Sequence, residues 1–254
     1  MTNIRLEGAH NVRDLDGLPA GDAVTRAGVL LRSDALDSLT PADVAVLVEQ
    51  YRVAHVIDLR SHAERAEKGR GPLGETAVRY SDLDVIDEAD LARRSDHRAA
   101  SFAAGIDPNV IIADGYVELL ELGASAFVAA LESIVSPGGA PALVHCAIGK
   151  DRTGVLVALL LGTAGVEREA IVADYALSHQ TLGHIREQLE QSEAFQALAR
   201  QIPAFVFDAT PETMALFLDR LDDRWGGAAG YLTDNGVDPA AIDRWREIFL
   251  SPNV

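Results

Sequence analysis

The sequence lacks the features that mark secreted and membrane proteins. Only one of its 254 residues is cysteine, Cys146, so the chain has no internal disulfide. Secreted proteins commonly carry disulfides, and a reducing, cytoplasmic location is therefore the expectation. No apolar run approaches the roughly 20 residues that a membrane-spanning helix needs. The first eight residues lack the apolar segment of a signal peptide. We predict no stable membrane association.

Positive charge is also scarce. The chain has 22 lysines and arginines against 39 aspartates and glutamates, a formal net charge of −17. Nucleic acids and anionic bilayers would be repelled, so we predict no nucleic acid partner. Lysine itself is nearly absent, since only Lys68 and Lys150 occur. An anionic substrate would therefore need a local positive field.

Short apolar runs alternate with helical patterns along the chain. The runs predict strands over residues 29–32, 53–59, 78–81 and 142–145. Cap-plus-proline pairs predict helix starts at Thr40, Thr210 and Asp238. Apolar periodicity predicts further helices over 116–135, 152–162 and 167–178. This alternation predicts one α/β domain over residues 1–254, with a mostly parallel central sheet and helices on both faces.

Two segments look peripheral to that domain. Residues 84–108 are polar and loop-like. Residues 184–208 begin amphipathic and turn apolar at 202–207. The second segment is either part of the core or a helical lid, extending to about residue 225, because a lid needs an apolar underside to exclude water.

The chemistry is carried by residues 145–154, His-Cys-Ala-Ile-Gly-Lys-Asp-Arg-Thr-Gly, between a predicted strand and a predicted helix. Inward-pointing backbone amides at such a junction form an anion-binding nest, and the helix dipole adds to it. The residues expected to bind phosphate here are Ala147, Ile148, Gly149, Lys150 and Thr153.

Cys146 is the predicted nucleophile of this loop. In a positive field its thiol should ionise below the usual pKa of about 8.5. Arg152, six residues later, can return its guanidinium fork to two phosphate oxygens. The hydroxyl of Thr153 can bind the sulfur and ease its departure.

Two other interpretations of the loop are weaker. A buried structural cysteine would explain Cys146 alone, but not the placement of Gly149, Arg152 and Thr153 around it. A Walker nucleotide-binding loop requires serine or threonine after the lysine and a glycine five positions before Gly149. Asp151 and Val144 occupy those positions.

The loop resembles that of the atypical protein tyrosine phosphatases of bacteria and fungi, whose pattern is His-Cys-x-x-Gly-Lys-Asp-Arg-Thr-Gly. Further matching segments are residues 11–17 (with Asp16 in place of a glycine), 31–36, 56–61, 174–178 and 230–236. The resemblance implies a three-layer tyrosine-phosphatase-like fold without metal or cofactor, and in some members a helical lid. It implies activity on phosphotyrosine, and in some members on phosphoserine, phosphothreonine and phosphoinositides.

The group that protonates the leaving oxygen is less evident. Asp58 ends a predicted strand, where ligands of parallel sheets gather, and the resemblance also indicates Asp58. Asp151 is the second candidate, although two basic neighbours should keep it ionised. A third set lies in the polar segment after the strand at 78–81: Asp82, Asp84 and Asp87.

Structural roles compete with these assignments. Asp58 could instead form an ion pair with Arg60 or Arg13, and Arg32 is also more typical of an ion pair than of a ligand. Arg60 is the exception that we assign to phosphate, because it projects to the same side of the strand as Asp58. No cluster of His, Cys and Asp has ligand spacing, so we predict no metal.

These residues predict a phosphatase that works through a phosphocysteine intermediate. A phosphate-binding module without activity is a rival, which the presence of nucleophile, arginine and threonine disfavours. A different cysteine enzyme, such as a sulfurtransferase, is the second rival.

Overall fold

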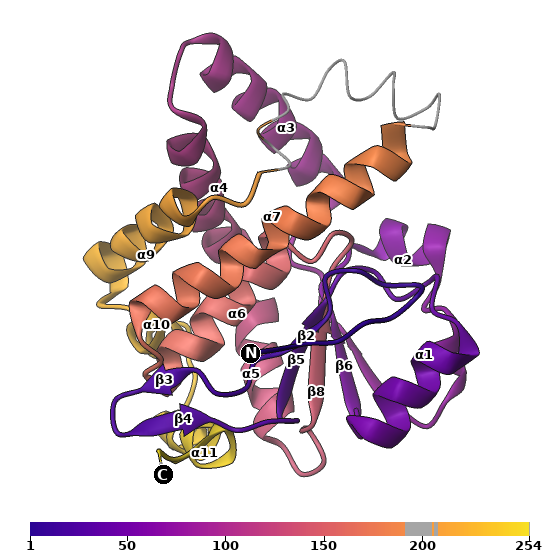
Figure 1. Ribbon diagram of the computed structural model, residues 1–254. Helices are drawn as coiled ribbons and strands as arrows, with labels where there is room; N and C mark the ends of the chain where they lie inside the picture. The colour runs from indigo at the N-terminus through magenta and orange to yellow at the C-terminus, as the bar shows by residue number, and fades with distance from the viewer. Residues whose placement is uncertain (191–204, 206–207, 254) are drawn as a thin grey trace.

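The computed structural model is organised around one mixed β-sheet (Figure 1). The structure describes residues 1–190, 205 and 208–253. Within them, six strands form one sheet in the order β1-β2-β5-β8-β6-β7. Their bounds are β1 (Thr2–Asn3), β2 (Arg13–Asp14), β5 (Leu30–Ser33), β8 (Ala142–His145), β6 (His55–Asp58) and β7 (Arg79–Asp82).

The four strands predicted from apolar runs are the four parallel strands of this sheet. β8 pairs in parallel with β5 and with β6, and β6 pairs in parallel with β7. The short strands β1 and β2 add an antiparallel edge that the sequence did not predict. The predicted α/β architecture with a mostly parallel sheet is confirmed.

Alternate side chains of the central strands enter two cores. On β8, Leu143 packs with one core, whereas Ala142 and Val144 pack with the other. Because side chains of a strand alternate between the two faces, a continuous apolar run is what a sheet covered on both faces requires.

Helices cover both faces, as Figure 1 shows. The smaller core lies under α1 (Pro41–Ala45), the π-helix η1 (Val46–Gln50) and the 3₁₀ helix η2 (Pro72–Glu75). The larger core lies under α4 (Pro108–Leu122), α5 (Ala124–Val135), α6 (Asp151–Ala164), α7 (Arg168–Glu190), α9 (Pro211–Trp225), α10 (Ala228–Asp234) and α11 (Pro239–Phe249). None of the described helices is long and apolar enough to cross a membrane.

The predicted helix starts are confirmed. Thr40 caps α1 in a capping box with Asp43, and Thr210 and Asp238 cap α9 and α11. The single helix predicted over 116–135 is instead two, α4 and α5. They separate at Gly123, where a Cβ would lie 2.5 Å from the Val85 side chain.

The polar segment 84–108 was wrongly predicted as loop-like. It contains α3 (Glu88–Ala103), which begins after the cap Asp87. The helix packs on α4, and its Arg94 is only 4% exposed. Its contact with α4 uses arginine side chains, so an apolar pattern did not reveal it.

A second, three-stranded sheet was also missed. It consists of β3 (Pro19–Ala20), β4 (Ala23–Thr25) and β9 (Leu250–Pro252), and it joins the two ends of the chain. Strands of two or three residues are too short to show a periodic pattern.

Of the segment 184–225 in which a lid is predicted, residues 191–204 and 206–207 lie outside the described residues. The described end of that range is α9, whose Met214 and Phe217 are fully buried in the larger core.

Candidate active site

The loop 145–154 lies where parallel strands end. His145, the last residue of β8, is paired with Ser33 of β5 and with Asp58 of β6. Cys146 follows directly, and α6 begins at Asp151. The loop therefore sits between the carboxyl ends of three strands and the amino end of a buried helix, where helix and backbone dipoles favour an anion.

Hydrogen bonds from outside the loop set the direction of its amides. Ala35 N–H donates to the Ala147 carbonyl (3.2 Å). The Asn11 side chain donates to the carbonyls of Ile148 (3.4 Å) and Gly149 (3.1 Å). In a trans peptide the carbonyl and the next N–H point in opposite directions. The amides of Ile148, Gly149 and Lys150 therefore point away from these partners, into the loop.

The sulfur of Cys146 lies on the inner side of this loop. Gly149 N–H donates to Cys146 Sγ at 3.3 Å, and Cys146 is 2% exposed. Thr153 is fully buried near the start of α6, and its hydroxyl has no hydrogen-bond partner among the described residues.

Gly149 is required where the loop meets β5. Its φ is +73°, a conformation that side chains disfavour, and a Cβ there would lie 2.5 Å from the Ser33 carbonyl oxygen. Arg32 of β5 also donates to the Gly149 carbonyl, at 2.6 Å. Strand and loop are thus in direct backbone contact.

Arg152 is held in place by a partner that sequence reasoning missed. Its guanidinium forms two hydrogen bonds to Glu64 (2.5 and 2.8 Å) and one to the Leu59 carbonyl (3.3 Å). Glu64 belongs to the first turn of α2 (His62–Lys68). Burial opposes the charge of Arg152, but the Glu64 carboxylate and the Cys146 sulfur outweigh burial and raise its pKa.

Glu64 had one visible signal in the sequence. Ser61 and Glu64 have the spacing of a capping box, and both capping hydrogen bonds are present. The pattern would have placed Glu64 at a helix start. The capping-box pattern does not predict the ion pair between Glu64 and Arg152.

Asp58 forms the ion pair that was the alternative to its catalytic role. Its carboxylate is 0% exposed and receives hydrogen bonds from the Arg60 guanidinium at 2.7–3.2 Å. Burial would raise the pKa of Asp58, but His145 and Arg60 outweigh burial and hold that pKa well below its usual value. Arg60 also donates to the Gly69 carbonyl. These contacts argue against Asp58 as proton donor and against Arg60 as phosphate ligand.

Asp151 lies in a different environment at the loop. Its side chain is 28% exposed. It accepts a hydrogen bond from Tyr116 (2.8 Å), whose hydroxyl also meets that of Tyr175 (2.7 Å). Burial tends to raise the pKa of Asp151, but Lys150, Arg98 and Tyr116 outweigh burial and lower it. Asp151 is therefore an ionised carboxylate that meets solvent.

Lys150 points its amine into the protein. Its Nζ donates to the Asp208 carbonyl (3.1 Å) and lies 3.5 Å from Asp151. The residue is 1% exposed, and burial lowers the pKa of its amine. Its side chain thus stabilises the loop from beneath, in addition to the amide that it contributes.

The three loop aspartates have structural partners. Asp82 pairs with Arg70 (2.6 Å), and Asp84 accepts from the His62 amide (2.8 Å). Asp87 caps α3. None of them contacts the phosphate loop in the described structure.

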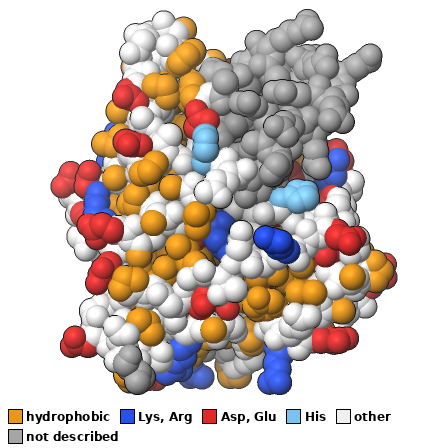
Figure 2. Space-filling model, in the orientation of Figure 1, with side chains coloured by type: hydrophobic (Ala, Val, Ile, Leu, Met, Phe, Trp, Pro, Cys, Tyr) orange, Lys and Arg blue, Asp and Glu red, His pale blue; other side chains and the backbone are white. Residues whose placement is uncertain are grey.

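A buried ion triad supports the loop from behind. Asp174 of α7 binds Arg13 of β2 (2.7 Å) and Arg32 of β5 (2.5 Å), and all three are at most 3% exposed. Figure 2 shows acidic side chains spread over the described part of one face of the molecule. Because Arg13, Arg32 and Arg152 are each paired with a carboxylate, the inward amides of the loop and the amino end of α6 supply the positive potential that an anionic substrate needs. No group of three or more potential metal ligands occurs among the described residues.

This chain is similar in sequence to known phosphatases. The family model described as "Tyrosine phosphatase family" matches residues 4–251. Over 279 residues the chain is 30% identical to the triple specificity protein phosphatase PtpB of Mycobacterium tuberculosis, covering 96% of this chain and 98% of that protein. A tyrosine-protein phosphatase of Nostoc commune is 31% identical over 138 residues, 52% of this chain and 47% of that protein. The catalytic core of the PP-IP phosphatase SIW14 from S. cerevisiae is 16% identical, with a TM-score of 0.39 over 70% of this chain and 78% of that chain.

Proposed function

This chain belongs to the tyrosine phosphatase family, and on that premise we propose that it hydrolyses phosphotyrosine through a phosphocysteine formed on Cys146. The observation that supports this most is the orientation of the loop: three amides point inward, and one of them binds the Cys146 sulfur. The relative from M. tuberculosis is named a triple specificity protein phosphatase, which supports substrates beyond phosphotyrosine, namely phosphoserine, phosphothreonine and phosphoinositide monoesters.

In the first step the Cys146 thiolate attacks phosphorus, and the bond from phosphorus to the ester oxygen breaks. The inward amides of Ile148, Gly149 and Lys150, together with Arg152, stabilise the charge on the three equatorial oxygens. Glu64 already orients the Arg152 guanidinium, so Arg152 loses little conformational freedom when it binds the transition state.

The leaving oxygen must receive a proton, and we assign that transfer to Asp151. Of the two main candidates it is the one with solvent access, at 28% exposure against 0% for Asp58. Asp151 is ionised in the free protein. A phosphate dianion bound beside it raises its pKa, because like charges disfavour ionisation. Substrate binding thereby favours the protonated acid that the first step requires.

In the second step water attacks phosphocysteine. The Asp151 carboxylate accepts a proton from the water, the bond from sulfur to phosphorus breaks, and the thiolate and inorganic phosphate are released. The Thr153 hydroxyl is buried and has no hydrogen-bond partner among the described residues, and we assign to it the hydrogen bond that the departing sulfur accepts in this step.

The test is turnover of p-nitrophenyl phosphate in the presence of a chelator. We expect the wild type to turn over and Cys146→Ser to be inactive while still binding vanadate, because the substitution leaves the amide cradle in place. Alkylation of Cys146 should be slower with vanadate bound. Full activity of Cys146→Ser would exclude the nucleophile. Vanadate binding without wild-type turnover would indicate a binding module, and turnover of a different oxyanion alone would indicate another cysteine enzyme.

A further inference from the structure

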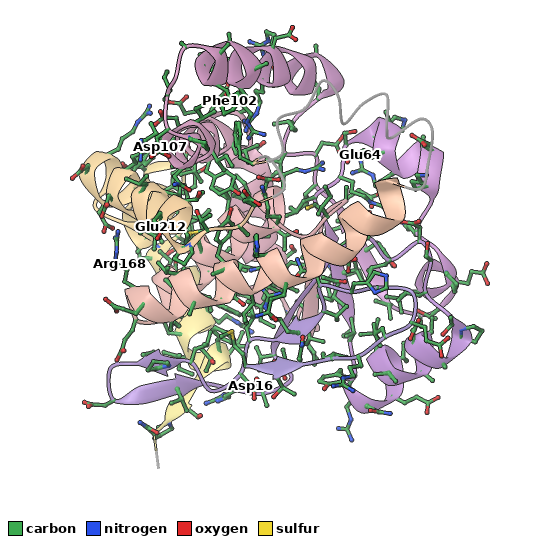
Figure 3. All side chains as sticks on the ribbon, turned by 45° about the horizontal axis from the view of Figure 1, so that its top comes forward. Asp16, Glu64, Phe102, Asp107, Arg168 and Glu212 are labelled. Atoms are coloured by element: carbon green, nitrogen blue, oxygen red, sulfur yellow. The ribbon has the colours of Figure 1, made fainter. Side chains whose placement is uncertain are left out.

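A cavity of about 370 Å³ lies between α3 and α4. Figure 3 labels Phe102 near the end of α3 and Asp107 at the start of α4, which mark the connection between the two helices. The α3 wall of the cavity carries Arg94, His97 and Arg98. This is a concentration of basic side chains in a chain whose net charge is −17. Arg94 contributes to the packing of α3 on α4, whereas the phosphate loop makes no hydrogen bond to these side chains in the described structure.

A glycine makes room for two of these arginines. A Cβ on Gly115 would lie 2.9 Å from Nη2 of Arg98 and 3.4 Å from Nη2 of Arg94. Arg94 also donates to the Gly115 carbonyl, at 2.8 Å. Glycine inside a helix is unfavourable, and here its lack of a side chain lets two guanidinium groups lie against the helix backbone. The absence of a side chain at Gly115 thus makes room for both guanidinium groups in the cavity wall.

The carboxylates of the cavity are already paired, whereas Arg98 is not. Asp114 binds Arg220 at 2.6 Å, and Glu118 lies 3.5 Å from Arg94. In the part of the chain that the structure describes, Arg98 has no carboxylate within ion-pair distance, and its Nε is buried without a hydrogen-bond partner. An anion in the cavity would supply the missing counter-charge to the Arg98 guanidinium.

The cavity is close to the phosphate loop. Gly115 precedes Tyr116, and the Tyr116 hydroxyl is 2.8 Å from Asp151. The guanidinium of Arg98 is therefore separated from the edge of the loop by about the length of one tyrosine side chain. Its positive charge contributes to lowering the pKa of both Asp151 and Lys150.

We propose that this cavity is a substrate subsite that binds one acidic side chain of a phosphotyrosine peptide while the phosphotyrosine occupies the loop. The inference rests on the proposed phosphatase function and adds a substrate preference to it. An aspartate or glutamate near the phosphotyrosine would place its carboxylate on Arg98, and its methylene groups would pack against Ile106 and Ile111, which also line the cavity.

A peptide suits the cavity better than a second phosphate of a phosphoinositide. The Tyr116 side chain lies between the cavity and Asp151, and an extended peptide, which advances about 3.3–3.6 Å per residue, can pass beyond it. Asp114 and Glu118 in the wall would repel a multiply charged phosphate more than a single carboxylate. The net charge of −17 also opposes approach to an anionic membrane.

The test compares two phosphotyrosine peptides that differ only in having glutamate or glutamine at the positions beside the phosphotyrosine. The measured quantity is the ratio of kcat/KM for the acidic peptide to that for the neutral one, which cancels any general effect of a substitution on catalysis. We expect a ratio of about ten in the wild type, the value of one partly desolvated charged hydrogen bond. Arg98→Gln should lower the ratio to about one.

Two further variants complete the design. Arg93→Gln is the matched control, because Arg93 is on the same helix, 69% exposed, and outside the cavity wall. It should keep the wild-type ratio. Gly115→Ala displaces both guanidinium groups without removing a charge, and it should lower the ratio as Arg98→Gln does. It serves as the test if Arg98→Gln does not fold.

The outcomes separate this inference from the proposed function. A wild-type ratio of about one, with both peptides turned over, overturns the subsite and leaves the phosphatase standing. Failure to turn over either peptide or p-nitrophenyl phosphate overturns the proposed function itself. If Arg98→Gln leaves the peptide ratio unchanged but selectively reduces turnover of a soluble short-chain phosphoinositide, the cavity binds a second phosphate and the peptide assignment is wrong.

Discussion

Asp58 and Asp151 are identical side chains at the same end of the sheet, but their surroundings give them different chemistry. Asp58 is fully buried, and its carboxylate is engaged in an ion pair with Arg60, so it is not available to transfer a proton to substrate. Asp151 is partly exposed and held by a tyrosine hydroxyl, which leaves one face of the carboxylate to substrate or water. Burial and partner, rather than residue type, decide which of the two can transfer a proton.

Asp151→Asn should therefore reduce catalysis. We expect kcat for alkyl and aryl phosphates to fall by about 10²–10⁴, the usual contribution of general acid–base catalysis. Substrates with very acidic leaving groups need less help and should lose much less. The measurement is kcat against leaving-group pKa for both proteins. Parallel plots for wild type and variant would contradict the assignment.

Asp58→Asn should mainly reduce stability. It removes the carboxylate 2.7 Å from the buried Arg60 guanidinium and leaves Asp37, 3.8 Å away, as the remaining ion-pair partner; breaking a buried pair costs about 3–5 kcal/mol of unfolding free energy. Urea unfolding measures this loss. The control is Asp82→Asn at the neighbouring strand end, where Asp82 and Arg70 are 35% and 44% exposed; exposed pairs contribute about 0–1 kcal/mol. Normal stability with a large fall in kcat would restore Asp58 as the acid.

At the scale of elements, the first turn of α2 and the first turn of α6 are joined by one ion pair. Glu64 completes the capping box of α2 and also fixes the guanidinium of Arg152. The helix start and the arginine of the loop therefore share one carboxylate. Damage to the ion pair and damage to the cap can be separated by substitution.

Glu64→Gln should lower kcat/KM by tenfold or more, on the order of the 1.4 kcal/mol that one weakened charged interaction contributes. The amide keeps the shape of the side chain but cannot hold both guanidinium nitrogens. Ser61→Ala is the control: it removes the cap, at a cost of about 1 kcal/mol in stability, and leaves the Glu64–Arg152 pair intact. Equal losses of activity in both variants would show that the helix start matters rather than the ion pair.

At the scale of the whole molecule, one buried triad connects distant parts of the chain. Asp174 of α7 holds Arg13 and Arg32 of adjacent strands, and the same arginine of β5 binds the Gly149 carbonyl. The arrangement ties the N-terminal strands and α7 to the phosphate loop. Its stability should depend on pH through one carboxylate.

Burial would raise the pKa of Asp174, but Arg13 and Arg32 outweigh burial and lower it below the unfolded value of about 3.9. A lowered pKa in the folded state contributes stability above the unfolded pKa, which is lost as pH falls through the folded pKa. Asp174→Asn should therefore be less stable than wild type at neutral pH, and the difference should shrink as pH falls below about 4. Urea unfolding across that range measures it. A difference independent of pH would contradict this account.

The sequence by itself determined the parts of the protein that depend on neighbouring residues. The four parallel strands follow from apolar runs, and helix starts follow from caps such as Thr40 and Asp238. The position of the phosphate loop is equally local, because its strand end, Gly149 and its helix start lie within ten residues. The direction of its amides also depends on hydrogen bonds from Asn11 and Ala35, which are distant in sequence. The family resemblance rests on the same contiguous motifs, and the family match confirms it.

Only the tertiary structure decided which side chains act together. Arg152 and Glu64 are 88 residues apart, and Arg13 and Asp174 are 161 apart, so no local pattern pairs them. The same limit hid α3, whose contact with α4 uses Arg94 and Gly115 rather than an apolar face. A carboxylate or guanidinium acquires its charge state and its role from whichever groups the fold brings within a few ångströms. That distance is a property of the folded chain and is not encoded in the spacing of residues along it.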